Sequence, residues 1–146
     1  DVNPSVLKAV LGSGETDVFK ISKKLCALNP IVQGDNFKEY TATFKRVANI
    51  IKDLDVNSTL EVKEELLEDT AEKELFQAYT TVTAKKLTCY EDQLEALFGL
   101  KPQLDNFFDN VFVNHEDEAI KTNRKNTIGK VYQEFRKIAD IKEITI

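Results

Sequence analysis

Basic side chains recur at helical spacing after Phe37. At about 100° of rotation per residue, one stripe beside the apolar face of this segment carries Lys38, Lys45, Asn49 and Lys52, with Arg46 beyond them. Cations bind phosphate oxygens, and amide edges pair with unstacked bases. The spacing therefore leaves two interpretations open: a surface that binds RNA, or a solvated helix face.

A second stripe follows the apolar positions near the end of the chain and carries Lys121, Lys125, Tyr132 and Arg136. Its aromatic ring adds a surface on which a base could stack. Arg124 projects from the apolar positions themselves. A buried ion pair with an acid such as Asp109 or Asp117 is the favoured interpretation for it.

Charge is segregated along the chain although the net charge is −5. Segments 20–52 and 119–137 each have a balance of +5, and segment 61–74 has a balance of −5. Local charge steers a polyanion more than the total does. The two basic segments are compatible with a nucleic-acid partner or with an acidic protein.

Residues for catalysis or metal binding do not occur in a recognisable pattern. His115 has no second histidine four residues later, and Cys26 and Cys89 have no companion ligand at zinc spacing. Residues 12–14 lack the strand and the Gly-Lys-Ser ending of a phosphate loop. We therefore predict no catalytic residue, no metal site and no cofactor in this chain, and reduced cysteines in the cytoplasm.

The elements that position these side chains are predicted to be helices. Only 5 glycines and 3 prolines occur in 146 residues, with 42% apolar and 31% charged residues. The sequence predicts an all-α, single-domain helical bundle of about six to seven helices. No apolar run approaches a membrane span.

Turn and cap residues predict where the helices begin and end. The predicted helices cover residues 4–12, 17–28 (after a Thr16 or Asp17 cap, closed by Asn29-Pro30), 37–51, a segment that starts at Asp69-Thr70 with Glu72, 90–98, a segment from Pro102, and 114–140 with Asn114 as the cap. After a break at residues 57–59, Ser58 and Glu61 also have the form of a capping box, which indicates a helix start. Apolar residues 104, 107, 108, 111 and 112 are predicted to be core.

Several stretches together resemble one protein family. These are residues 104–114 (LDNFFDNVFVN), 116–124 (EDEAIKTNR), 135–141 (FRKIADI), 45–52 (KRVANIIK) and 67–76 (LEDTAEKELF). They are similar to the C-terminal part of the β subunit of bacterial tetrameric glycyl-tRNA synthetase. The similarity spans nearly the whole chain and is weakest before Phe37. Residues 118–121 (EAIK) depart from the Asp-Ala-Leu-Arg signature of the related all-helical anticodon-binding domains.

The resemblance implies that residues 1–146 are an anticodon-binding domain excised from a longer β subunit. It implies tRNA-Gly as the ligand, with the α subunit and the remainder of the β subunit as partners in an α2β2 enzyme, and no membrane. Glycine activation with ATP and Mg²⁺ would then occur in the α subunit. No cofactor is implied for this segment.

The implied tRNA-binding residues lie on the two basic segments: Lys45, Arg46, Asn49, Lys52, Lys121, Asn123, Arg124 and Lys125. Asn123 could instead pack at the helix edge, and Arg124 could lie beneath the binding surface. Two other functions stay open, namely a helical protein-interaction module and the anticodon domain of an arginyl- or cysteinyl-type synthetase.

Overall fold

The computed structural model describes residues 3–144 and contains seven α-helices, two 3-10 helices and no strand within them. The elements are α1 (Pro4–Gly12), α2 (Val18–Gln33), α3 (Phe37–Ile51), η1 (Glu64–Leu66), α4 (Thr70–Ala84), α5 (Tyr90–Phe98), α6 (Lys101–Asn110), α7 (Glu118–Arg136) and η2 (Ile141–Glu143). The predicted all-α fold is confirmed. Residues 1, 2, 145 and 146 of the predicted domain lie outside the described part.

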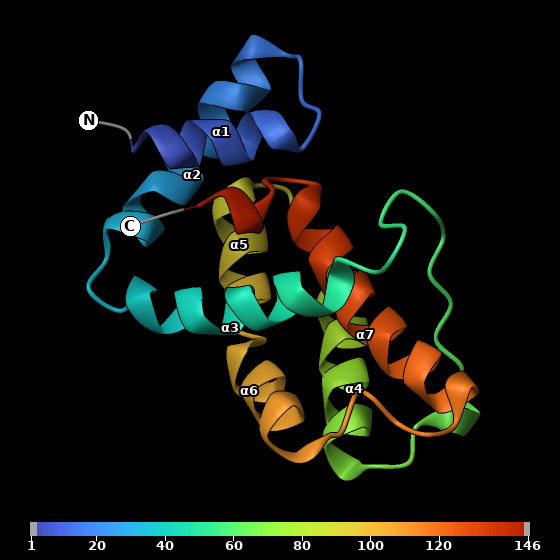
Figure 1. Cartoon of the computed structure of the whole chain (residues 1–146). Coiled ribbons are helices and arrows are strands. Elements are labelled where there is room, and N and C mark those ends of the chain that lie inside the picture. Colours follow the sequence, from blue (N-terminus) through green and yellow to red (C-terminus); the bar gives the residue numbers. More distant parts are fainter. Residues whose placement is uncertain (1–2, 145–146) are drawn as a thin grey trace.

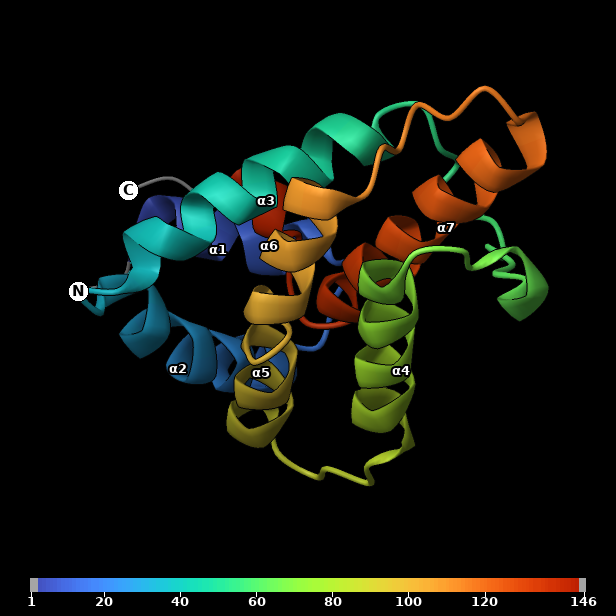
Figure 2. The same cartoon turned by 90° about the horizontal axis from the view of Figure 1, so that it is seen from below.

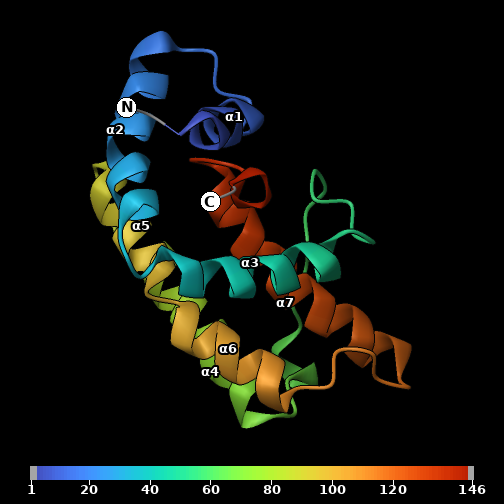
Figure 3. The same ribbon diagram turned by 60° about the vertical axis from the view of Figure 1, so that its left-hand side comes forward.

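Helix α7 is the central element because nine of its nineteen residues are buried. Figure 1 shows α3 crossing α7, with α1 and the start of α2 at one end of the molecule. Figure 2 shows α5 and α6 following each other end to end, with α4 beside α6. Figure 3 shows α2 running along the side of α5. Helix α3 therefore has one face on the bundle and one face outside it.

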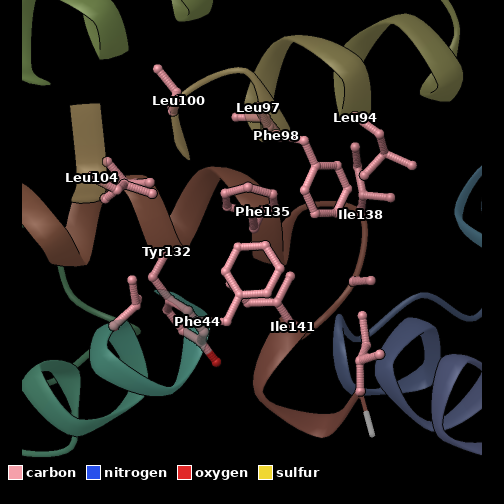
Figure 4. Packing of buried hydrophobic residues seen from close by; sticks show 14 of the residues in the cluster. Phe44, Leu94, Leu97, Phe98, Leu100, Leu104, Tyr132, Phe135, Ile138 and Ile141 are labelled. Atoms are coloured by element: carbon pink, nitrogen blue, oxygen red, sulfur yellow. The ribbon is translucent and has the colours of Figure 1, made fainter. Parts of the chain in front are cut away.

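Three aromatic rings join three helices at the centre of the core. Phe135 of α7 lies 5.4 Å from both Phe44 of α3 and Phe98 of α5, measured between ring centroids. The Phe44 and Phe98 centroids are 5.5 Å apart. Figure 4 shows Phe135 and Phe44 facing each other inside the cluster. Edge-to-face packing of this kind adds to the apolar area that the rings bury.

At the starts of α2 and α4, short polar side chains cap the helix where the sequence predicts a cap. Asp17 accepts hydrogen bonds from two backbone N–H groups of α2. Asp69 and Glu72 form a complete capping box at the start of α4. The predicted starts of α2 and α4 are confirmed.

Helix α2 ends later than predicted. It continues through Pro30 to Gln33, where the sequence predicts closure at Asn29-Pro30. Pro30 and Cys26, whose carbonyl loses its helical donor, are both exposed, so water can satisfy that carbonyl. Val32, in the added turn, is buried and its packing offsets the cost of the proline.

The segment after α3 is not the helix that Ser58 and Glu61 predict. The Ser58 hydroxyl donates instead to the carbonyl of Asp55 at 2.7 Å, and regular structure resumes only at η1. The segment covers α7, where a Cβ added at Gly129 would lie 2.4 Å from Leu60 Cδ1. A larger residue at this position would therefore require the Leu60 side chain to move.

The boundaries of α7 also differ from the prediction. Asp117, and not Asn114, caps the helix, because its carboxylate accepts from the N–H groups of Ala119 and Ile120. The helix ends at Arg136 rather than at residue 140. Asp140 then turns inward and accepts a hydrogen bond from the Tyr132 hydroxyl.

None of the helices within residues 3–144 combines the length and the apolar character that crossing a membrane would require.

Candidate nucleic-acid interface

The outer stripe of α3 is the most accessible cationic surface that the sequence predicts. Lys38, Lys45, Asn49 and Lys52 are all exposed, while Phe37, Phe44, Val47 and Ile51 on the opposite side of the helix are buried. The apolar face orients the helix, so the four polar side chains must project outward. Within residues 3–144, the three lysines form no ion pair, so their charges are available to a ligand.

Arg46 lies at the edge of this stripe and is held by α6. Its Nη1 is 3.5 Å from Asp109 Oδ1, and its guanidinium carbon is 5.8 Å from the centroid of the Phe108 ring. The side chains of Arg46 and Asp109 remain 55% and 67% exposed. A planar guanidinium above an aromatic ring is restrained in orientation and can still donate to a phosphate or a base edge.

A partly buried polar cluster fixes α3 against α6. The Thr43 hydroxyl and the Lys101 ammonium both donate to the Asp105 carboxylate. Burial acts to raise the pKa of Asp105, but these two hydrogen bonds outweigh it and hold the pKa below its ordinary value. The hydrogen bond to Asp105 correspondingly raises the pKa of Lys101. This cluster sets the position from which α3 presents its stripe.

Replacing Asp105 with asparagine should make the free energy of unfolding depend less strongly on pH in the acidic range. Because the folded-state pKa of Asp105 is lowered, its contribution is present above the unfolded-state pKa and is lost as pH falls through the folded-state pKa. Urea unfolding between about pH 7 and about pH 2 measures this loss. Lys101→Met should reduce the same pH dependence. An equally strong pH dependence in wild type and Asp105→Asn would contradict the assignment.

The second stripe, on α7, mainly holds the segment that covers it. Lys125 Nζ is 3.5 Å from Asp53 Oδ2, and the Arg136 guanidinium donates to the side-chain oxygen of Asn57 at 2.8 Å. Tyr132 is 1% exposed, so its ring is not available to a base. Lys121 is partly exposed and has no ion pair within the described residues. Lys121, Lys125 and Arg136 are all partly exposed, but Lys125 and Arg136 are held by the partners just named.

Asn123 and Arg124 are buried and have protein partners. The Asn123 amide exchanges two hydrogen bonds with the backbone of Lys63, at 2.7 and 3.1 Å. Arg124 Nε and Nη2 lie 3.0 and 2.8 Å from Glu72 Oε1. The predicted buried pair of Arg124 is therefore present, but its partner is Glu72 and not Asp109 or Asp117. Both residues act beneath the surface, and we do not retain them as RNA contacts.

The two stripes meet at one end, where acidic residues also gather. Asp53, which pairs with Lys125, directly follows Lys52 of the α3 stripe. A cleft of about 410 Å³ beside the first half of α7 is lined by Glu61 and Glu118 as well as Lys63. A polyanion is thus attracted more strongly to the α3 stripe than to α7.

Two features of this surface differ from the sequence-based expectation. Phe108 and Asp109 contact Arg46, which the local spacing does not indicate. Phe112 is predicted to be core, but it is 70% exposed. Among residues 3–144, no three His, Cys, Asp or Glu side chains gather where they could hold a metal ion.

Several known proteins that are similar to this chain have the same name. Each of them is a protein named glycine–tRNA ligase β subunit. The one from Helicobacter pylori (strain G27) is 37% identical to this chain and covers all of it. The one from Solidesulfovibrio magneticus is 33% identical over 97% of the chain, and the one from Myxococcus xanthus is 35% identical over 95% of the chain. The chain is homologous to a segment of these β subunits.

The matched segment is 21–22% of each of these relatives, so the chain spans about a fifth of their length. No protein-family model matches the chain. Similarity to β subunits over nearly the whole chain agrees with the family resemblance seen in the sequence.

Proposed function

We propose that this chain is the part of a glycine–tRNA ligase β subunit that binds tRNA-Gly through its anticodon arm. The observation that carries the proposal is the exposed stripe of α3, whose lysines have no ion-pair partner within residues 3–144. Similarity to the β subunits along the whole chain supports the ligand. The related anticodon domains of arginyl- and cysteinyl-type synthetases are a weaker candidate, because these relatives are glycine–tRNA ligases.

The stripe and its neighbours supply complementary contacts. Lys45 and Lys52 bind phosphates, and Asn49 between them presents an amide to a base edge. Arg46, restrained by Asp109 and Phe108, binds a phosphate or a base at the edge of the stripe. Lys121 and Lys125 contribute further phosphate contacts where the two stripes meet.

Catalysis belongs to the rest of the enzyme in this proposal. The α subunit activates glycine with ATP and Mg²⁺, and this segment holds the tRNA within an α2β2 assembly in the cytoplasm. A β-subunit segment of this kind contributes affinity and substrate choice, because binding energy far from the reacting atoms positions the substrate.

Binding of this chain to tRNA-Gly tests the proposal, with an anticodon-swapped tRNA as the comparison. Wild type should prefer tRNA-Gly, and Lys45→Ala/Arg46→Ala should abolish that preference. Each lost phosphate contact should also reduce the slope of log affinity against log salt by about 0.7. Lys20→Ala/Lys23→Ala removes the same charge from exposed positions on α2 and is the matched control.

Equal effects of the two double variants would show that only net charge matters, and would contradict recognition by α3. A wild-type chain that fails to bind tRNA-Gly even at low salt would overturn the proposed function.

A helical protein-interaction module is the second candidate. Within residues 3–144, five large apolar side chains are exposed, and four of them are in α1 and at the start of α2: Leu7, Leu11, Val18 and Phe19. Exposed apolar side chains that lie near one another are a feature of docking surfaces. A chain that binds no tRNA but associates through these residues would favour this function.

A further inference from the structure

Phe112 lies in the connection between α6 and α7 and projects a 70% exposed ring into solvent. The residues on either side of it do not share this exposure: Val111 is buried and Val113 is half-buried. Within residues 3–144, the other exposed large apolar side chains lie in α1 and at the start of α2, so none of them accompanies Phe112 in this connection. Figure 1 shows the connection, in orange, between the end of α6 and the start of α7.

Hydrogen bonds to α6 and α7 anchor the backbone that carries this ring. Arg124 Nη1 donates to the carbonyl of Phe112, and the same guanidinium is paired with Glu72, which is fully buried. Val111 N–H donates to the Phe107 carbonyl at 2.8 Å, which anchors the start of the connection on α6. Because this backbone is already anchored, a ligand that covers the ring has to order only the Phe112 side chain.

The chain immediately before Phe112 carries the contacts of Arg46. Phe108 and Asp109, which restrain the Arg46 guanidinium, precede Phe112 by four and three residues. Stacking rings beside cations are the recurring arrangement of proteins that bind single-stranded nucleic acid. A protein partner would instead be expected to use a wider apolar surface than one ring.

We propose that Phe112 is a base-stacking residue, and that an unpaired nucleobase of the bound RNA lies against its ring while Arg46 contacts the adjoining backbone. The inference rests on the proposed function and extends it, because it adds a contact that distinguishes unpaired from paired nucleotides. The buried pair of Arg124 and Glu72 acts as a positioning device for this ring.

Tryptophan fluorescence tests the stacking directly, because the chain contains no tryptophan. Phe112→Trp introduces a single reporter that tRNA-Gly should quench on binding. Phe19→Trp places the same reporter at an 81% exposed position on α2, and its fluorescence should not change. A fully paired RNA duplex of similar length should quench neither variant.

Affinity measurements give the second readout. Phe112→Ala should weaken tRNA-Gly binding about 10-fold to 100-fold, whereas Phe112→Tyr should retain it and Phe19→Ala should have no effect. The salt slope should stay at its wild-type value, because no cation is removed.

Unchanged Phe112→Trp fluorescence at a saturating concentration of tRNA-Gly, with wild-type affinity in Phe112→Ala, would overturn the stacking role and leave the proposed function intact. A wild-type chain that binds no tRNA-Gly would overturn both. Phe112→Ala that keeps its tRNA affinity but no longer associates with another protein would assign the ring to protein docking.

Discussion

Replacing Arg124 with methionine is expected to lower the free energy of unfolding by about 3–5 kcal/mol, because one partner of a buried ion pair is removed. Arg124 and Glu72 are 5% and 0% exposed. Without the guanidinium, the only donor left to the Glu72 carboxylate among residues 3–144 is the N–H of Asp69, at 3.2 Å. The carbonyl of Phe112 loses its side-chain donor as well.

Urea unfolding of the single and double variants measures this effect. Glu72→Gln combined with Arg124→Met should recover much of the loss, because no uncompensated charge then stays buried and the amide can still accept from Asp69. Lys125→Met, on the next residue of α7, removes only the pair with Asp53 and should cost less than about 1 kcal/mol. A similar loss in Arg124→Met and Lys125→Met would contradict a buried, energetically coupled pair.

For the ion pair of Arg124, the sequence predicts that the arginine is buried but does not predict its partner. The apolar positions of the last helix place Arg124 on the buried side, which correctly predicts a buried pair. The partner is 52 residues away, on α4. Local spacing contains no information on which acid the folded chain brings there, so acids near in sequence were the natural candidates. Glu72 itself was visible only as a capping residue, a role that it also has.

The two basic stripes also show how far helical periodicity predicts which side chains are exposed. Periodicity correctly predicts which side chains of α3 face outward, because its other face is apolar. On α7 the same reasoning fails, because residues 53–63 cover that side of the helix: Asp53 pairs with Lys125, and the Asn57 side chain accepts from Arg136. That covering segment has no helical period, so its path cannot be inferred from the sequence.

Phe112 is exposed although the apolar character of residues 104–112 predicts it to be core, because the helix that buries its apolar neighbours ends before it. Residues 104, 107, 108 and 111 follow the period of α6, and Phe112 fits its next position. The helix ends at Asn110, so Phe112 is in a connection whose direction the period no longer determines. The asparagines at 110 and 114 were the available signal for a break, since asparagine is common at helix ends and in turns.

Phe135→Ala is expected to destabilise the fold about as much as the loss of Arg124, by about 3–5 kcal/mol. Phe135 is 1% exposed, and its ring contacts both Phe44 and Phe98, so its removal leaves a cavity where α3, α5 and α7 meet. Well-packed interiors collapse only partly into such cavities, and the remaining space adds to the lost apolar burial.

The comparison with Phe135→Leu separates the cavity from the loss of aromatic character. Leucine retains most of the apolar volume, so it should cost clearly less than alanine, while Phe19→Ala at an exposed position should change stability by less than about 0.5 kcal/mol. Chemical denaturation provides all three values. Because Phe44 belongs to α3, this cluster and the Asp105 hydrogen bonds jointly hold the helix that carries the cationic stripe. A Phe135→Ala chain as stable as wild type would mean that the aromatic cluster does not determine the position of α3.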